Sequence, residues 1–369
     1  MDRYLPDVSV GFIVERISKY YINFLKKENE MRKARIMFLW GPPGIGKTES
    51  VEQIAARLHK ETGKRVVVTS IRLSNFTRPD LVGFMIYDRE NKKAIWLPPE
   101  NFVLEENENT INLVFLDEIP DAHEHLQKAV NQIVDERTVG VHKLADNSFF
   151  ILAGNRKTDN CMTYRMPDST GNRLRHYNVK ADFDSWKHWA INHGIHEKVL
   201  GYLSYDNSKL YDLEKERDRV AFASPRSWTA VSDLLYVMED ETLEELYEDI
   251  SGDISMGTAR EFMTWCRLHD QLPKTSDIFA GKTTMYPKTT DALYALISSM
   301  TVYVSQHREQ MTERNLENGC KYASRFPVDF SSMFFRNLLE VEGMELKLQT
   351  SPSFQNWMNR NKQFLLRRK

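Results

Sequence analysis

A glycine-rich loop at residues 41–48 constrains the fold of this chain more than any other feature. The loop reads Gly-Pro-Pro-Gly-Ile-Gly-Lys-Thr and follows a short apolar run at residues 35–40. The segment 49–59 has apolar residues at helical spacing, and β-branched residues fill 65–71. Strand, loop, helix and strand in this order predict a βαβ unit, and such units build parallel sheets.

The loop itself matches the P-loop pattern in full, with two glycines separated by four residues and followed by Lys47 and Thr48. Its glycines let backbone N–H groups point at phosphates, and the following helix adds its positive end. Lys47 is expected to reach the β- and γ-phosphates, and Thr48 to bind Mg²⁺. We therefore predict ATP and Mg²⁺ as ligands, with the nucleotide contacting Gly41, Pro42, Pro43, Gly44, Ile45, Gly46, Lys47, Thr48 and Glu49.

Two later apolar runs end in polar residues that suit the same chemistry. Residues 111–116 lead to Asp117 and Glu118, and residues 149–153 lead to Gly154 and Asn155. Chemistry in open parallel sheets gathers at the carboxyl ends of the strands. Asp117 is predicted to hold Mg²⁺, and Glu118 to activate the attacking water. Asn155 could orient that water, although asparagine beside glycine is also a common turn residue.

The rest of the chain divides into regions of different pattern. A weaker strand is predicted at 176–181, and hairpins at 84–97 and 138–144. Helices are expected at 183–192, 197–205, 227–239, 242–249, 258–269 and 291–307, with a linker at 272–287. We expect a nucleotide-binding core at 1–182, a helical lid at 183–272 and a C-terminal helical extension at 273–369.

Composition indicates which binding partners and which cellular compartment to expect. The 50 basic and 52 acidic residues nearly cancel, which disfavours a dedicated nucleic-acid binder. Cys161, Cys266 and Cys320 are widely spaced, which predicts reduced thiols in a cytoplasmic protein. No stretch approaches 18 uninterrupted apolar residues, so we expect no membrane span.

The order of these motifs resembles the AAA+ ATPases, and within them the MoxR-like branch. Segments similar to that branch are Leu73–Gly83, Leu116–Ile119, Ala153–Arg156 and Ser224–Trp228. The resemblance covers roughly residues 8–272. It implies an α/β fold: a P-loop AAA+ core, with a parallel sheet flanked by helices and with β-hairpin insertions, followed by an α-helical lid and a C-terminal helical extension. The sequence of the lid region is also compatible with a phage or mobile-element origin. In that case the protein is expected in the host cytoplasm.

The resemblance assigns further residues by their positions. It makes Asn155 the first sensor of the nucleotide and Arg226 the second. Asn172-Arg173-Leu174 resembles the turn that bears the arginine finger, a cation placed in the active site of a neighbouring subunit. Arg175 could take this role instead, and we prefer Arg173.

Three functions follow from the resemblance. The first is an ATP-hydrolysing ring, expected to be a homo-hexamer, that remodels protein complexes as a chaperone, often with a von Willebrand factor A-type partner. The alternative is a nucleic-acid motor or loader, whose ring pore would be lined by Lys92, Lys93 and Lys143. The third, ATP binding for assembly alone, is disfavoured by the intact Glu118.

Overall fold

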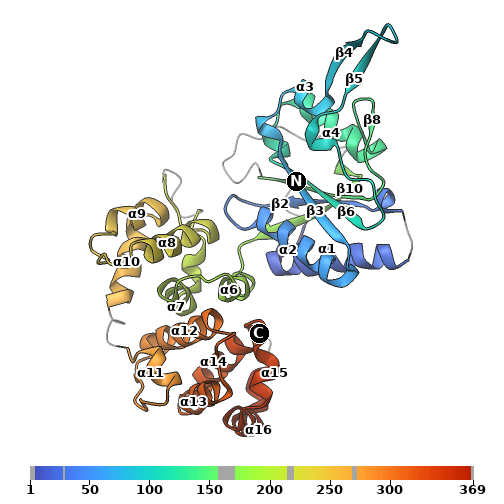
Figure 1. Ribbon diagram of the computed structural model, residues 1–369. Coiled ribbons are helices and arrows are strands. Elements are labelled where there is room, and N and C mark those ends of the chain that lie inside the picture. Colours follow the sequence, from blue (N-terminus) through green and yellow to red (C-terminus); the bar gives the residue numbers. More distant parts are fainter. Residues whose placement is uncertain (1–4, 28–29, 157–170, 214–219, 268–271, 367–369) are drawn as a thin grey trace. The chain divides into compact units, whose positions relative to one another are not determined.

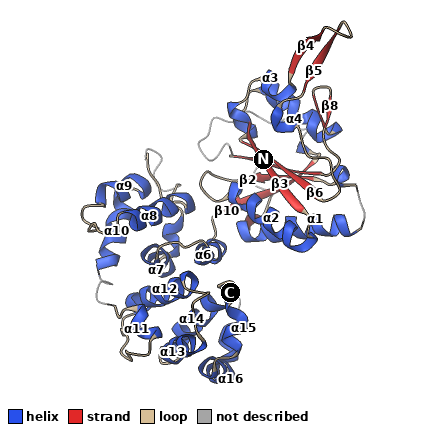
Figure 2. Cartoon of the chain, in the orientation of Figure 1, coloured by secondary structure: helices blue, strands red, loops and turns tan. Residues whose placement is uncertain are grey.

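The computed structural model of the protein describes residues 5–27, 30–156, 171–213, 220–267 and 272–366. The chain forms two compact units, Met1–Lys180 and Ala181–Lys369 (Figure 1). Strands belong to the first unit, and the second unit is helical in its described part (Figure 2). Each unit is treated by itself below.

The first unit contains a six-stranded parallel sheet in the order β1-β10-β2-β9-β6-β3. The five predicted runs all form strands of this sheet, and a short edge strand, β1, was not predicted. The strands are β1 (Asp7–Ser9), β2 (Ile36–Trp40), β3 (Arg65–Arg72), β6 (Thr110–Asp117), β9 (Ser148–Gly154) and β10 (Leu174–Lys180).

Helices cover both faces of this sheet, which explains why its central strands are largely apolar. Every residue of β9 is buried. On one face the Tyr21 ring stacks on Phe149 with centroids 4.0 Å apart. On the other face, α4 packs Val130 and Ile133 against Phe150 and its neighbours. The helices of this unit are α1 (Val10–Lys26), α2 (Lys47–Thr62), α3 (Arg78–Val82) and α4 (Glu124–Glu136).

Both predicted hairpins are present. The first pairs β4 (Phe84–Asp88) with β5 (Lys93–Leu97), and Figure 1 shows it extending away from the sheet. The second pairs β7 (Thr138–Val139) with β8 (His142–Lys143) through Gly140, whose φ is 59°. A left-handed residue at such a tip favours glycine because a Cβ would be strained there.

The second unit is built from helices that share one apolar core. This core runs from Trp186 to Trp357, so the predicted lid and C-terminal segments pack together. Its helices are α6 (Phe183–Asn192), α7 (Glu197–Tyr205), α8 (Pro225–Val237), α9 (Tyr247–Ile254), α10 (Met256–Arg267), α11 (Thr275–Phe279), α12 (Thr290–Gln306), α13 (Glu313–Ala323), α14 (Val328–Glu340), α15 (Met344–Gln349) and α16 (Pro352–Leu366).

Two predictions in this unit were wrong. The supposed linker at 272–287 contains α11, whose Ile278 and Phe279 are 1% and 0% exposed. The proline and glycine residues flank this short helix and do not indicate an unpacked segment. The helix expected at 242–249 begins only at Tyr247, and residues 243–246 form turns.

Two expectations from composition can be compared with the described residues. Cys266 and Cys320 are buried, and burial raises the pKa of the Cys320 thiol to about 12. Cys161 lies outside the described residues. Within the described ranges, no helix has the length and apolar character needed to cross a membrane.

Candidate nucleotide-binding site

The glycine-rich loop follows β2 directly and leads into α2. Gly44 and Gly46 have φ of 78° and 96°, so both adopt left-handed backbone that other residues rarely take. A Cβ on Gly41 would lie 2.6 Å from the Val179 carbonyl oxygen on β10. Glycine is therefore required at three positions of the loop, by conformation at two and by close approach at one.

Lys47 is the first residue of α2, directly after the last glycine of the loop, and is 9% exposed. Its Nζ donates hydrogen bonds to the carbonyl oxygens of Gly41 and Pro42, at 2.7 and 2.9 Å. It also donates to Oδ1 of Asn155 at 3.1 Å. The lysine thus links the loop after β2 to the residue that follows β9, and these two strands are neighbours in the sheet.

The acidic pair ends β6, on the other side of β9. Asp117 is the last residue of the strand, and its Oδ1 accepts a hydrogen bond from the Glu118 backbone N–H at 2.8 Å. Glu118 has φ of 58°, an uncommon conformation for a residue with a side chain. The Ser74 hydroxyl donates to Oε2 of Glu118.

The donor set fits a phosphate group and a hard divalent cation. Thr48 is exposed at the second position of α2, and Asp117 is part-exposed. Because one strand separates β2 from β6, their ends lie about 10 Å apart. Phosphate oxygens and a Mg²⁺ ion with its waters would fill such a gap between a hydroxyl and a carboxylate.

Arg173 lies at the amino ends of the parallel strands, whereas the glycine-rich loop lies at their carboxyl ends. It precedes β10, where Leu174 pairs with Ile36 at the start of β2, whereas the glycine-rich loop follows the end of β2. Its Nη1 lies 2.8 Å from Oδ2 of Asp135, and its side chain is 52% exposed. The Arg175 guanidinium instead lies over the Tyr20 ring, 4.7 Å from its centroid.

Two other residues were predicted to bind the nucleotide, Glu49 and Arg226. Glu49 is in the first turn of α2, where its Oε1 accepts a hydrogen bond from Gln53 at 3.4 Å. Arg226 belongs to the second unit and is exposed in the first turn of α8, after the N-cap Ser224.

Sequence reasoning missed two polar residues of the site, Ser74 and Asp121. Ser74 contacts Glu118, as described above, and Asp121 Oδ2 accepts a hydrogen bond from Asn155 Nδ2 at 3.4 Å. Burial raises the pKa of the Asp121 carboxyl, and the nearby Glu118 carboxylate raises it further. Both residues follow strand ends, and this position was the only signal that the sequence offered.

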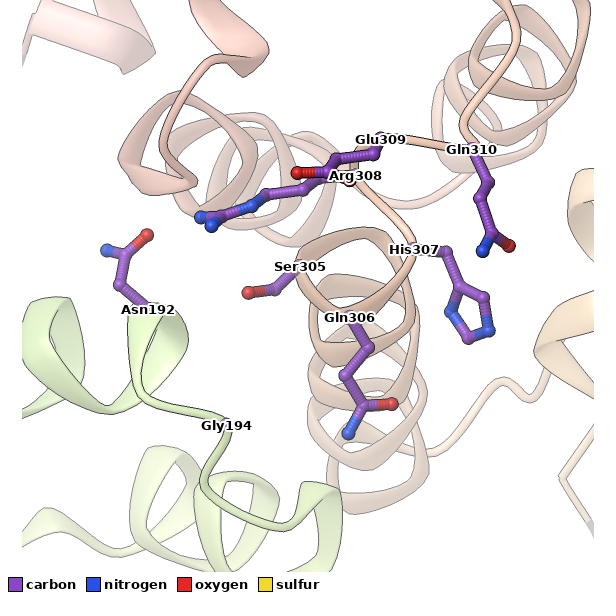
Figure 3. A pocket seen from close by; sticks show the side chains of 8 residues that line it. All are labelled: Asn192, Gly194, Ser305, Gln306, His307, Arg308, Glu309 and Gln310. Atoms are coloured by element: carbon purple, nitrogen blue, oxygen red, sulfur yellow. The ribbon is translucent and has the colours of Figure 1, made fainter.

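A separate hollow of about 360 Å³ occurs in the second unit, where α6 and α12 end. Figure 3 shows its lining, which is mostly polar. The lining residues are Asn192, Gly194, Ser305, Gln306, His307, Arg308, Glu309 and Gln310. None of the predicted site residues lies there.

The sheet order, the loop after β2 and the helical second unit define a P-loop AAA+ fold. Residues 36–175 match the family model described as "ATPase family associated with various cellular activities (AAA)". This segment, which contains the glycine-rich loop, the acidic pair and Asn155, therefore belongs to the AAA family of ATPases.

Solved structures with a similar chain path are distant. A variant of Thermotoga maritima RuvB has a TM-score of 0.37 at 12% identity, covering 84% of this chain and 88% of RuvB. The same organism's RuvB, titled a Holliday junction branch migration motor, has 0.36 at 13%, covering 87% and 90%. NtrX from Brucella abortus has 0.37 at 11%, covering 96% and 67%. Such values say nothing about what this chain acts on. The comparison with curated proteins found no match.

Proposed function

We propose that this chain hydrolyses ATP in a ring of identical subunits and uses the energy to remodel protein complexes, as MoxR-like ATPases do. The observation that carries the ATPase activity is the contact between Lys47 and Asn155, beside the acidic turn that follows β6. Phosphoryl transfer to water requires a phosphate-binding cation, a neutral polar residue and carboxylates. Three neighbouring strand ends supply these groups here.

Each group has a distinct role in this proposal. The loop N–H groups and Lys47 bind the phosphates, and Lys47 exchanges the carbonyl oxygens of Gly41 and Pro42 for phosphate oxygens. Thr48 and Asp117 would hold Mg²⁺, which supplies positive charge to the phosphates when bound. Glu118 accepts the proton of the attacking water through Oε1, because its Oε2 accepts from the Ser74 hydroxyl.

The position of Arg173 supports the proposal of a ring. Five residues of β2 separate the level of Arg173 from the glycine-rich loop, which corresponds to about 17 Å along the strand. This exceeds the reach of an arginine side chain, so Arg173 cannot touch the phosphates bound by its own subunit. The half-exposed Arg173 guanidinium would exchange its ion pair with Asp135 for the phosphates of a neighbour, whereas Arg175 is stacked on Tyr20.

Protein is favoured over nucleic acid as the substrate because of the hairpin β4–β5. This hairpin exposes large apolar side chains from both strands, including Phe84 and Tyr87 at 60% and 64%. Its charged residues nearly balance, since Asp88 and Glu90 accompany the basic residues at the tip. Lys143, expected to attract phosphate backbones, is paired with Asp146 at 2.9 Å. Apolar exposed surface suits polypeptide, and a von Willebrand factor A-type protein is the partner class that we propose.

Mixing two inactive variants tests the ring and the catalytic roles together. Glu118→Gln removes the base and spares the phosphate site, and Arg173→Ala removes the finger and spares ATP binding. Each variant alone should hydrolyse ATP on the order of 10³-fold more slowly than the wild type. Mixed rings contain interfaces that pair an intact Glu118 with an intact Arg173, so the mixture should regain measurable turnover.

Three results would contradict the proposal. Wild-type turnover in Glu118→Gln would place the base elsewhere. Absence of rescue in mixed rings, with co-assembly verified by native mass spectrometry, would exclude Arg173 as a finger that acts in trans. A chain that remains monomeric with ATP bound would exclude the ring. Arg226→Ala in the same assay tests the proposed second sensor. We expect this variant to bind ATP but to hydrolyse less of the ATP that it binds.

A further inference from the structure

Asp121 is a carboxylate beside the nucleotide site that the roles described above do not use. It ends the short turn Ile119–Asp121, which begins directly after Glu118. Its Oδ2 accepts from Asn155 Nδ2 at 3.4 Å, and Asn155 Oδ1 accepts from Lys47 at 3.1 Å. The three side chains therefore form a chain of hydrogen bonds from the carboxylate to the phosphate-binding lysine.

This arrangement is fixed by close packing of the backbone. The Asp121 backbone N–H donates to the Glu118 carbonyl oxygen at 3.1 Å, which closes the turn. Pro120 packs so closely on Gly154 that a Cβ there would lie 2.1 Å from the proline Cδ. Because Gly154 directly precedes Asn155, the turn and the asparagine are held against each other.

The other oxygen of this carboxylate is costly to bury. Asp121 Oδ1 is shielded from solvent and has no hydrogen-bond partner among the described residues. A buried acceptor without a partner costs about 1–3 kcal/mol. The Glu118 and Asp117 carboxylates nearby add repulsion. A residue with no function beyond closing the turn would avoid both costs as alanine.

We propose that Asp121 is a positioning residue that fixes the orientation of the Asn155 amide. The carboxylate accepts from the NH₂ group, so the amide oxygen must face Lys47 and the terminal phosphate. An amide oxygen is a hydrogen-bond acceptor, and beside anionic phosphate oxygens its suitable partner is a donor such as the attacking water. Asp121 thereby determines that Asn155 acts on the water rather than as a donor to phosphate. This inference rests on the ATPase function proposed above.

Asp121→Asn tests this role because it keeps the shape and removes the charge. An amide at position 121 can face Asn155 with either end, so both amide orientations become available. We expect kcat for ATP hydrolysis to fall about tenfold, the usual scale for one hydrogen bond to a charged group, with KM within about twofold. Asp146→Asn, the same chemical change on the surface of the first unit, should leave both constants unchanged.

An exchange of the two side chains separates positioning from a structural role. Asn155→Asp alone opposes two carboxylates and should be nearly inactive. Asp121→Asn combined with Asn155→Asp restores one amide, one carboxylate and the donor–acceptor pair, and should recover kcat at least about tenfold over Asn155→Asp. A purely structural role for Asp121, in which relief of the repulsion restores only the packing, predicts recovery of Tm without this recovery of kcat.

The outcomes distinguish this inference from the proposed function. ATP hydrolysis by the wild type that is lost in Lys47→Ala establishes the function independently. If Asp121→Asn then retains wild-type kcat, or the exchanged pair is no better than Asn155→Asp, the positioning role is wrong and the ATPase assignment stands. If the wild type does not hydrolyse ATP at all, both are wrong.

Discussion

Replacing Gly154 with alanine would force a methyl group into the ring of Pro120. The new Cβ would lie 2.1 Å from the proline Cδ and 2.5 Å from its Cγ. Neither atom belongs to a flexible chain end, so the turn that carries Glu118 and Asp121 must shift away from β9. Overpacking of this kind costs typically about 1–3 kcal/mol.

The magnitude can be measured as a change in melting temperature. For a unit of the size of Met1–Lys180, a loss of 1 kcal/mol lowers Tm by about 2–4 °C, so 2 kcal/mol corresponds to roughly 4–8 °C. Differential scanning calorimetry would follow the transition of this unit. Displacement of Glu118 should also lower kcat by more than about tenfold, while ATP still binds to the glycine-rich loop.

Gly252→Ala is the matched control for this substitution. A Cβ at Gly252, inside α9, has no atom within 4 Å and needs no unusual backbone angle. Alanine there should be neutral or stabilise the protein by up to about 1 kcal/mol. If Gly154→Ala left both Tm and kcat unchanged, the close contact between the turn and β9 would not be what positions the acidic residues.

Three further predictions concern other parts of the chain. Lys47→Ala should weaken ATP binding roughly a hundredfold, as measured by fluorescent-nucleotide titration, and leave the far-UV circular dichroism unchanged; wild-type affinity would contradict the P-loop role. Tyr87→Ser with Trp96→Ser should weaken binding of an unfolded polypeptide such as casein without changing basal turnover, whereas Leu346→Ser, at a still more exposed apolar residue on α15, should leave this binding unchanged. Burial and the nearby Lys198 lower the pKa of His196 to about 4, below its ordinary value, so protonation favours unfolding. The second unit should therefore lose on the order of 3 kcal/mol as pH falls from about 6.5 to about 4, and calorimetry should find that His196→Gln lacks this loss.

The sequence alone was sufficient for features that depend on neighbouring residues. The glycine-rich loop, the five main strands and both hairpins were predicted because backbone conformation and apolar periodicity are local properties. The ends of α6 and α7 coincide with the predicted bounds for the same reason. Asp117, Glu118 and Asn155 were expected near the loop because parallel strands bring their carboxyl ends to one edge.

Only the tertiary structure decided which of these side chains meet. The order of the sheet places β9 between β2 and β6, and this order brings Asn155 into contact with Lys47. Asp121 follows a proline in the sequence and has the composition of an ordinary turn, so nothing local distinguishes it. Its relation to Asn155 depends on the contact between Pro120 and Gly154, which lie 34 positions apart.

Local sequence patterns likewise could not predict the packing of α11. Proline and glycine flank this short helix and predict a linker, yet Phe279 is buried, with its ring stacked 5.1 Å from that of Tyr303 on α12. Burial of a few apolar side chains outweighs weak local preference, and the partners that bury them are distant in sequence. The sequence thus determined the parts of the site, and long-range packing determined their arrangement.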